Sequence, residues 1–337
     1  MKPRVLVLYT GGTIGMQPSD RGYVPIRGFG RLMKAHLQTR ASHQLPEYEL
    51  IELDALIDSA NLVPSDWGRI GGRIVEQWDA YDGFVILHGT DTMAYTASAL
   101  SFMLRGIDKP VIVTGSQIPL TETRNDALDN LVTALMLAGR AEISEVCIYF
   151  DGRLLRGNRS TKLKSAGFDA FDSPNHPWLG QVGIHIDLKR HLLLKPGRRE
   201  FLLPAFAADA VSVAQIYPGI SARVIESHLE PDNVRGLILQ TYGVGNVPDN
   251  NPSLLRVLGR AVEQGKVILN ISQCIQGKID QGVYATGASL NPIGVIPGAD
   301  LTLEAAFTKL HTLLGEGLNA SRVRQAMSVS ICGECTC

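Results

Sequence analysis

Apolar runs of four or five residues alternate with longer amphipathic stretches along the first two-thirds of the chain. The apolar runs lack polar alternation, which is typical of strands whose two faces are both covered by helices. Repeated strand–helix units favour a mostly parallel sheet. The predicted strands are residues 5–9, 49–53, 83–87, 111–114 and 146–150, and the predicted helices are residues 64–78, 93–104 and 125–137. Ser65 or Asp66 can cap the first of these helices.

The pattern changes character after residue 186. Residues 188–208 are polar and are interrupted by proline and glycine, which is typical of a linker. A second series follows, with predicted strands at 211–215, 236–240 and 266–271 and predicted helices at 253–264 and 303–315. We therefore predict an α/β fold of two α/β domains. The larger N-terminal domain, residues 1–187, carries a mostly parallel sheet and the catalytic residues, and residues 209–337 form the C-terminal domain.

Composition and charge narrow the classes of function. The 337 residues are long enough for about two domains without disulfide or metal staples. With 32 basic and 33 acidic residues the chain lacks the positive field that nucleic acid or an anionic membrane would require. Residues 5–9 are too short for the apolar core of a signal peptide. We expect a cytoplasmic protein with reduced thiols and with no nucleic-acid or membrane partner.

Polar and glycine-rich segments follow the predicted strands. The carboxyl ends of parallel strands meet at one edge of a sheet, where α/β proteins place their ligands. These segments are Thr10-Gly11-Gly12-Thr13-Ile14-Gly15, His88-Gly89-Thr90-Asp91-Thr92, Gly115-Ser116-Gln117 and Asp151-Gly152-Arg153. We expect hydroxyls, a carboxylate and exposed backbone amides to share one pocket.

The segment around Thr13 admits three interpretations. Thr13 can be an ordinary turn residue beside two glycines. A nucleotide loop is disfavoured, because the glycine spacing does not match the dinucleotide motif and no Gly-Lys-Ser/Thr follows. A nucleophile loop also needs glycines, since they let backbone amides approach a reacting group closely.

Thr90, Asp91 and Lys162 each have a structural and a chemical interpretation. Thr90 and Asp91 can cap the helix near residue 93, or they can supply a reactive hydroxyl beside a site for a substrate ammonium. Lys162 is a surface lysine by default, but a partly buried lysine can act as a base. No Gly-x-Ser-x-Gly motif is present, and His88 packs equally well as a strand-end residue. With these two options disfavoured, the candidate group for activating a hydroxyl consists of a threonine, a lysine and an aspartate.

Two long motifs resemble the defining motifs of bacterial-class L-asparaginases: Tyr9-Thr10-Gly11-Gly12-Thr13-Ile14-Gly15-Met16 and Ile86-Leu87-His88-Gly89-Thr90-Asp91-Thr92-Met93-Ala94-Tyr95-Thr96. The resemblance continues at residues 114–119, 156–159, 217–220, 242–246 and 282–287 and so covers nearly the whole chain. Without an export signal, the sequence is most similar to the type I, cytoplasmic form.

The resemblance implies hydrolysis of L-asparagine to L-aspartate and ammonia through an acyl-threonine. It implies a nucleophile at Thr13, with Tyr23 as its partner on a mobile lid. It further implies a second catalytic group of Thr90, Asp91 and Lys162, and a substrate pocket that contains Asp58, Ser59, Thr90, Asp91 and Ser116, with Asp91 meeting the α-ammonium. Two α/β domains, a homotetramer built from dimers and the absence of any metal or organic cofactor are also implied. A simple dimer stays open.

Some type I enzymes carry a regulatory asparagine site. Thr161, Asn246 and Cys274 match it, but Gln240 stands where the regulated enzymes have arginine. A neutral amide lacks the bidentate fork with which arginine binds a carboxylate. We therefore expect weak or absent activation by substrate.

Two other functions are alternatives to this one. The asparaginase-like subunit of a tRNA-dependent amidotransferase carries an extra N-terminal domain, whereas the first motif here begins at residue 10. A non-catalytic amino-acid-binding module is disfavoured because all five catalytic residues are present. The preference between asparagine and glutamine stays open, since one methylene is worth only about 1–3 kcal/mol. The tail with Cys332, Cys335 and Cys337 lacks a fourth zinc ligand, and we expect it to be frayed and at most redox-sensitive.

Overall fold

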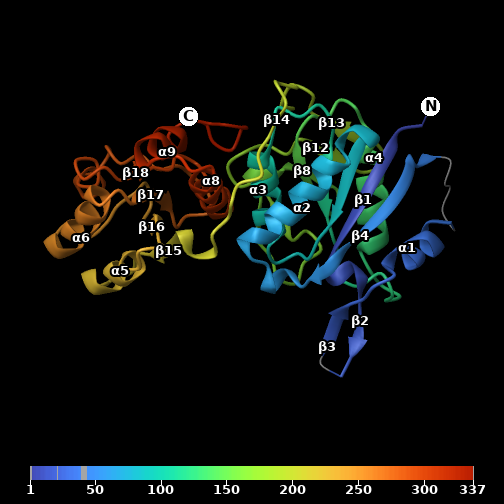
Figure 1. Cartoon of the computed structure of the whole chain (residues 1–337), viewed down its shortest axis with the longest axis horizontal. Coiled ribbons are helices and arrows are strands. Elements are labelled where there is room, and N and C mark those ends of the chain that lie inside the picture. The colour runs from blue at the N-terminus through green and yellow to red at the C-terminus, as the bar shows by residue number, and fades with distance from the viewer. Residues whose placement is uncertain (1, 21, 39–43, 337) are drawn as a thin grey trace. The chain divides into compact units, whose positions relative to one another are not determined.

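The computed structural model describes residues 2–20, 22–38 and 44–336 (Figure 1). The chain divides into two compact units, Met1–Leu203 and Pro204–Cys337. The division lies within residues 188–208. These residues are not all loop, because β14 (Glu200–Phe201) pairs with β6 (Leu104–Arg105) in the N-terminal unit.

The N-terminal unit is built on an eight-stranded sheet in the order β13-β12-β9-β8-β7-β5-β1-β4. Its parallel part confirms the predicted mostly parallel sheet. The parallel strands are β1 (Arg4–Gly11), β4 (Glu47–Ile57), β5 (Gly83–Leu87), β7 (Val111–Thr114) and β8 (Val146–Phe150). Antiparallel pairing then adds β9 (Arg153–Arg156), β12 (Gly180–Val182) and β13 (Ile186–Leu188).

Helices cover both faces of this sheet, as the apolar runs predict. The helices are α1 (Phe29–Gln38), α2 (Pro64–Glu76), α3 (Met93–Met103) and α4 (Ala127–Ala138). Residues of α1 and α4 share one apolar cluster with Val5 and Val7 of β1. On α2, a Cβ at Gly71 would lie 2.4 Å from Cε of Met103, so α2 and α3 pack closely against each other. The Asp66 carboxylate accepts a hydrogen bond from Val63 N at 3.0 Å, which completes the start of α2.

Within the described residues there are also three small antiparallel pairs and five short 3₁₀ turns. One hairpin joins β2 (Met16–Ser19) to β3 (Gly22–Pro25), and another pair joins β10 (Thr161–Lys162) to β11 (Phe171–Asp172), besides the β6–β14 pair. The turns are η1 (Thr13–Gly15), η3 (Ser59–Asn61), η4 (Trp78–Ala80), η5 (Gly157–Arg159) and η6 (Ala208–Ala210).

The C-terminal unit contains a four-stranded parallel sheet, which confirms the second α/β series. Its strands are β15 (Val211–Gln215), β16 (Gly236–Thr241), β17 (Val267–Ser272) and β18 (Ile296–Pro297). Its helices are α5 (Ala222–Leu229), α6 (Pro252–Glu263), α7 (Ala285–Ala288), α8 (Leu303–Gly315) and α9 (Ala320–Met327). Ile238 packs into one apolar cluster, whereas Leu237 and Leu239 pack into another, so both faces are buried.

The expectation of a frayed C-terminal tail is wrong as far as residue 336. Lys309 Nζ lies 2.7 Å from Glu334 Oε1, and both side chains are fully buried. The Glu334 carboxylate also accepts hydrogen bonds from the backbone amides of Ile331 and Cys332. Among residues 2–20, 22–38 and 44–336 no group of His, Cys, Asp and Glu is arranged to hold a metal ion; Cys337 lies outside these residues. Nor is any helix in that part of the chain long and apolar enough to cross a membrane.

Candidate active site

Close backbone contacts bring the loops after three strands together. Gly11 and Gly12 have φ angles of 119° and 87°, which disfavour any other residue. A Cβ on Gly12 would lie 2.3 Å from Gly89 N, and a Cβ on Gly11 would lie 2.3 Å from Ile57 O. The loop that carries Thr13 therefore touches the segment just before Thr90.

The Asp58–Ser59 segment belongs to the same edge of the sheet. Asp58 follows β4 directly, and its Oδ1 accepts from Ala60 N at 3.2 Å. Ser59 is buried, and a Cβ on Gly89 would lie 2.4 Å from its hydroxyl oxygen. The Thr92 hydroxyl donates to Ser59 O at 2.8 Å. The predicted substrate-binding segment thus lies against the loop that carries Thr90 and Asp91.

Thr90, Asp91 and Lys162 form one hydrogen-bonded group. Lys162 Nζ donates to the Thr90 hydroxyl oxygen at 2.8 Å and to Asp91 Oδ1 at 2.7 Å. The Lys162 side chain keeps 18% of its surface exposed and Thr90 is buried, whereas the Asp91 side chain is 61% exposed. The Asp91 side chain is therefore open to solvent, while Lys162 is mostly covered and is not a surface lysine.

The capping interpretation of Thr90 and Asp91 does not hold. The residue before α3 is Thr92, and its side chain makes no capping hydrogen bond. Thr90 and Asp91 instead turn toward Lys162, which arrives on β10 from about 70 residues further along the chain.

Tyr23 lies on the β2–β3 hairpin, opposite Pro18. The hairpin follows η1, the turn that opens at Thr13, without an intervening residue. Ile26 N donates to Gly15 O at 3.2 Å, which ties the end of the hairpin back to this turn. The Tyr23 ring is 48% exposed, and its hydroxyl donates to Glu122 Oε1 at 2.8 Å. Glu122 was not among the residues predicted from the sequence.

Two neighbouring residues after β7 differ in role. Ser116 is fully buried, and its hydroxyl donates to Ile118 O at 2.7 Å. Gln117 Oε1 accepts a hydrogen bond from the Thr90 hydroxyl at 3.2 Å. Gln117 was not among the residues predicted for the site, although a polar amide at a strand end was a usable signal.

His88 is a structural residue. Its Nδ1 lies 2.7 Å from Gly89 O and its Nε2 lies 2.9 Å from the Thr96 hydroxyl oxygen. A carbonyl can only accept, so Nδ1 carries the proton and Nε2 accepts from Thr96. Burial lowers the pKa of His88 to about 4, which keeps the ring neutral.

The four residues matched to a regulatory site are distributed over both units. Thr161 lies on β10 of the N-terminal unit. Gln240 lies near the carboxyl end of β16. Asn246 lies in the loop after β16, and Cys274 lies in the loop after β17. Asn246 Oδ1 accepts from the Thr286 hydroxyl at 3.0 Å, and Cys274 is exposed.

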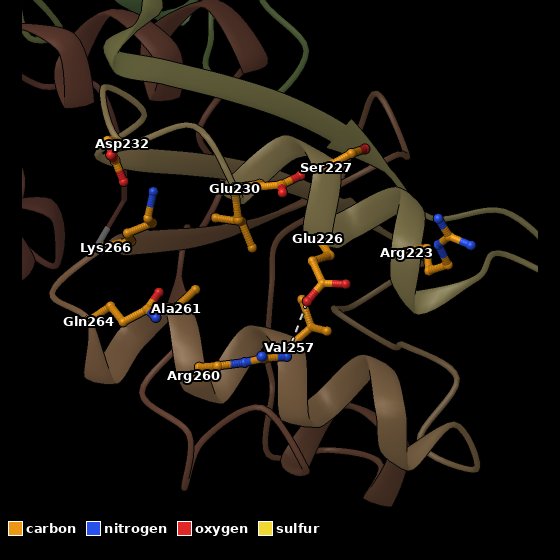
Figure 2. A pocket seen from close by; sticks show the side chains of 11 residues that line it. Arg223, Glu226, Ser227, Glu230, Asp232, Val257, Arg260, Ala261, Gln264 and Lys266 are labelled. Atoms are coloured by element: carbon orange, nitrogen blue, oxygen red, sulfur yellow. Dashed lines mark hydrogen bonds and ion pairs between the residues drawn. The ribbon is translucent and has the colours of Figure 1, made fainter.

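A groove of about 680 Å³ lies between α5 and α6 of the C-terminal unit (Figure 2). Three of its charged side chains already have partners. Arg260 meets Glu226 at 3.2 Å, and Lys266 donates to the carbonyls of Pro231 and Val234. The Ser227 hydroxyl donates to Val224 O, so this groove presents no activated nucleophile.

Comparison with known proteins agrees with this geometry. The family profile described as "Asparaginase, N-terminal" matches residues 4–194, and the one described as "Glutaminase/Asparaginase C-terminal domain" matches residues 210–327. L-asparaginase 1 of Escherichia coli strain K12 is 48% identical over 338 residues, which cover 99% of this chain and 98% of that protein.

Two solved structures are also similar. L-asparaginase I from Vibrio cholerae matches with a TM-score of 0.91 and 45% identity, and the match covers 100% of both chains. The thermostable L-asparaginase from Thermococcus kodakarensis matches with a TM-score of 0.88 and 34% identity, and the match covers 99% of both chains.

Proposed function

The chain belongs to the asparaginase family, and from this premise we propose that it hydrolyses L-asparagine to L-aspartate and ammonia through an ester on Thr13. The observation that carries the proposal is the backbone contact between Gly12 and Gly89, which sets the Thr13 loop against the hydrogen-bonded group of Thr90, Asp91 and Lys162. A nucleophile and a separate proton-transfer group on adjoining loops are what amide hydrolysis requires.

In the first half of the reaction, the Thr13 hydroxyl oxygen attacks the side-chain carbonyl carbon of asparagine. The Thr13 proton passes through Tyr23 to the leaving nitrogen, the C–N bond breaks, and ammonia leaves an ester on Thr13. Tyr23 is suited to this role because its hairpin adjoins the turn that holds Thr13. The Asp91 carboxylate pairs with the substrate α-ammonium, and the segment of Asp58 and Ser59 receives the α-carboxylate end.

In the second half, a water molecule attacks the ester carbon. Its proton passes through Thr90 to Lys162 in the amine form, the ester C–O bond breaks, and Lys162 returns this proton through Thr90 to the Thr13 oxygen. The 2.8 Å contact between Lys162 Nζ and the Thr90 oxygen gives the short path that this transfer needs. We further propose a cytoplasmic location and a homotetramer built from dimers, supported by the resemblance to type I enzymes.

The test is ammonia release from asparagine and, in parallel, from glutamine. Thr13→Ala is expected to abolish turnover and to leave the unfolding temperature unchanged, because Thr13 opens a loop at the sheet edge. Thr13→Ser keeps a hydroxyl and serves as the matched control. Turnover of Thr13→Ala within tenfold of the wild type would exclude Thr13 as the nucleophile.

A second experiment tests the relay. Thr90→Val and Lys162→Met are each expected to remove most activity, and the double variant is expected to be little worse, because residues that act as a unit are strongly non-additive. If the losses in the double variant multiply, the two residues do not form one relay.

A further inference from the structure

The Thr90 hydroxyl is held from two sides. Lys162 Nζ lies 2.8 Å from its oxygen, and Gln117 Oε1 lies 3.2 Å from the same oxygen. In the resting state Lys162 is an ammonium paired with Asp91 and has donors only, so the Thr90 oxygen accepts from Lys162. The hydroxyl hydrogen is left for Gln117, whose amide oxygen accepts it.

The orientation of the Gln117 amide is fixed by its other contacts. Its Nε2 donates to Ser165 O at 3.2 Å and to Gly167 O at 3.0 Å. Both partners are carbonyl oxygens, which only accept, so a flipped amide would set oxygen against oxygen. The oxygen of the amide must therefore face Thr90.

The backbone of Gln117 is fixed as well. Its N–H donates to both carboxylate oxygens of Asp126, at 3.1 and 2.9 Å. The same carboxylate accepts from Ile118 N at 3.0 Å and from Asn130 Nδ2 at 3.2 Å. Asp126 directly precedes α4, so the main chain of Gln117 is attached to a rigid helix.

We propose that Gln117 is a positioning residue for the relay, and that it acts only through Thr90. Hydrogen bonds run in one direction from Lys162 to Thr90 and from Thr90 to Gln117, and such chains polarise and strengthen their members. Gln117 thereby holds the Thr90 oxygen toward Lys162 and connects the relay to the turn at residues 165–167. The kinetic consequence rests on the proposed hydrolytic function.

A methionine at position 117 is a suitable probe. It keeps the length of glutamine and removes both the acceptor and the donors. A cavity of about 350 Å³ is lined by Gln117 together with Ile118, Arg124, Ser165, Ala166 and Phe168. Because the side chain borders this space, the substitution does not overpack the site, and its effect reports the lost hydrogen bonds.

Gln117→Met is expected to lower kcat about 5- to 10-fold and to leave KM within about twofold. The expected change in kcat is of the size caused by the loss of one intramolecular hydrogen bond at the reacting group. In a Thr90→Val background the same substitution is expected to change the residual kcat by less than about twofold, because the partner is already gone. An equal loss of kcat in both backgrounds, or a rise in KM alone, overturns the proposal.

The matched control is Gln281→Met in the C-terminal unit. Gln281 is buried, whereas Gln117 is half-buried, and the Gln281 amide makes comparable hydrogen bonds to Asn270, Asn291 and Val295. Gln281→Met is expected to lower the unfolding temperature at least as much as Gln117→Met and to leave kcat unchanged. A matching drop in kcat would mean that general destabilisation, not Thr90, explains Gln117→Met, and would overturn the proposal.

A readout without substrate separates this inference from the function itself. If the wild type releases no ammonia from asparagine, the proposed function fails. Denaturant unfolding of the wild type, Gln117→Met, Thr90→Val and the double variant still measures the coupling between the two side chains. If the shift in the unfolding midpoint of the double variant equals the sum of the two single shifts, the side chains are not coupled and the positioning role is overturned. A shift of the double variant that is smaller than this sum supports the positioning role.

Discussion

The Tyr23 hydroxyl donates a 2.8 Å hydrogen bond to Glu122 Oε1, and this contact fastens the β2–β3 hairpin to the segment between β7 and α4. The hydrogen bond to Glu122 raises the pKa of the Tyr23 hydroxyl, so the phenol stays protonated through neutral pH. Tyr23 can therefore relay a proton while the carboxylate holds the hairpin in place.

Tyr23→Phe is expected to lower kcat far more than Glu122→Gln does. Tyr23→Phe removes the hydroxyl that is proposed to transfer the proton and should lower kcat about 10²- to 10⁴-fold. Glu122→Gln keeps an acceptor at an exposed contact and should change kcat and KM only about two- to fivefold. Steady-state kinetics on asparagine check both, with Tyr48→Phe as a tyrosine control on β4. Equal losses in the two variants would instead place the Glu122 carboxylate in the chemistry.

Asp91 Oδ1 accepts a hydrogen bond from Lys162, and its proposed role is to pair with the substrate α-ammonium. Asp91→Asn is therefore expected to damage hydrolysis of asparagine far more than hydrolysis of an analogue without the α-amino group. Deleting either member of an ion pair matters less once the other is gone. The measurement is kcat/KM of both proteins on both substrates. Equal losses would assign Asp91 a direct part in the reaction.

The buried ion pair of Lys309 and Glu334 predicts a pH-dependent stability. Burial raises the pKa of Glu334, but the Lys309 ammonium and the amides of Cys332 and Ile331 outweigh burial and hold it below its usual value. The carboxylate therefore adds stability above the unfolded-state pKa of about 4.3, and this stability disappears as the pH falls through the lower folded-state pKa.

Lys309→Met should lower the free energy of unfolding by about 3–5 kcal/mol at pH 7, because it leaves a buried charge unpaired. At pH 4 the penalty should shrink, since the unpaired Glu334 can take up a proton. Urea unfolding at both pH values measures it. A penalty that is the same at both pH values would show that packing, not charge, explains the loss.

Because Gln240 stands where the regulated enzymes have arginine, we predict weak activation by substrate. A charge-assisted bidentate contact is worth roughly 1.5–3 kcal/mol, or about ten- to a hundredfold in effector affinity. The wild-type rate curve should be hyperbolic or only slightly sigmoidal, and Gln240→Arg should introduce sigmoidality. A wild-type Hill coefficient close to the number of subunits would mean that another group binds the effector carboxylate.

Burial decided how well the strands could be predicted. Residues 83–87, 111–114 and 146–150 were predicted with their observed bounds, because each strand is almost entirely buried and its apolar run stops where the strand stops. β4 lies at the sheet edge, and its flanking residues are partly exposed and polar, so the sequence showed only residues 49–53 of Glu47–Ile57.

Contacts between distant segments limited the prediction of the site. The β2–β3 hairpin is mostly exposed and contains Pro18 and Pro25, which argue against strands. The role of Gln117 depends on carbonyls 48 and 50 residues away, which no local pattern displays. Thr13, Thr90 and Lys162 could be predicted as site residues because strand ends and a family resemblance mark them.

The contact between Gly12 and Gly89 has a consequence for refolding. Each of the two loops restricts the conformation of the other, because their backbones touch where the parallel strands β1 and β5 end side by side. If β1 and β5 are not yet paired, the Gly12–Gly89 contact cannot form, and the position of Thr13 is not fixed. Recovery of ammonia release during renaturation should therefore lag behind the return of helical signal and coincide with long-range sheet closure, so that catalysis reports the completed topology.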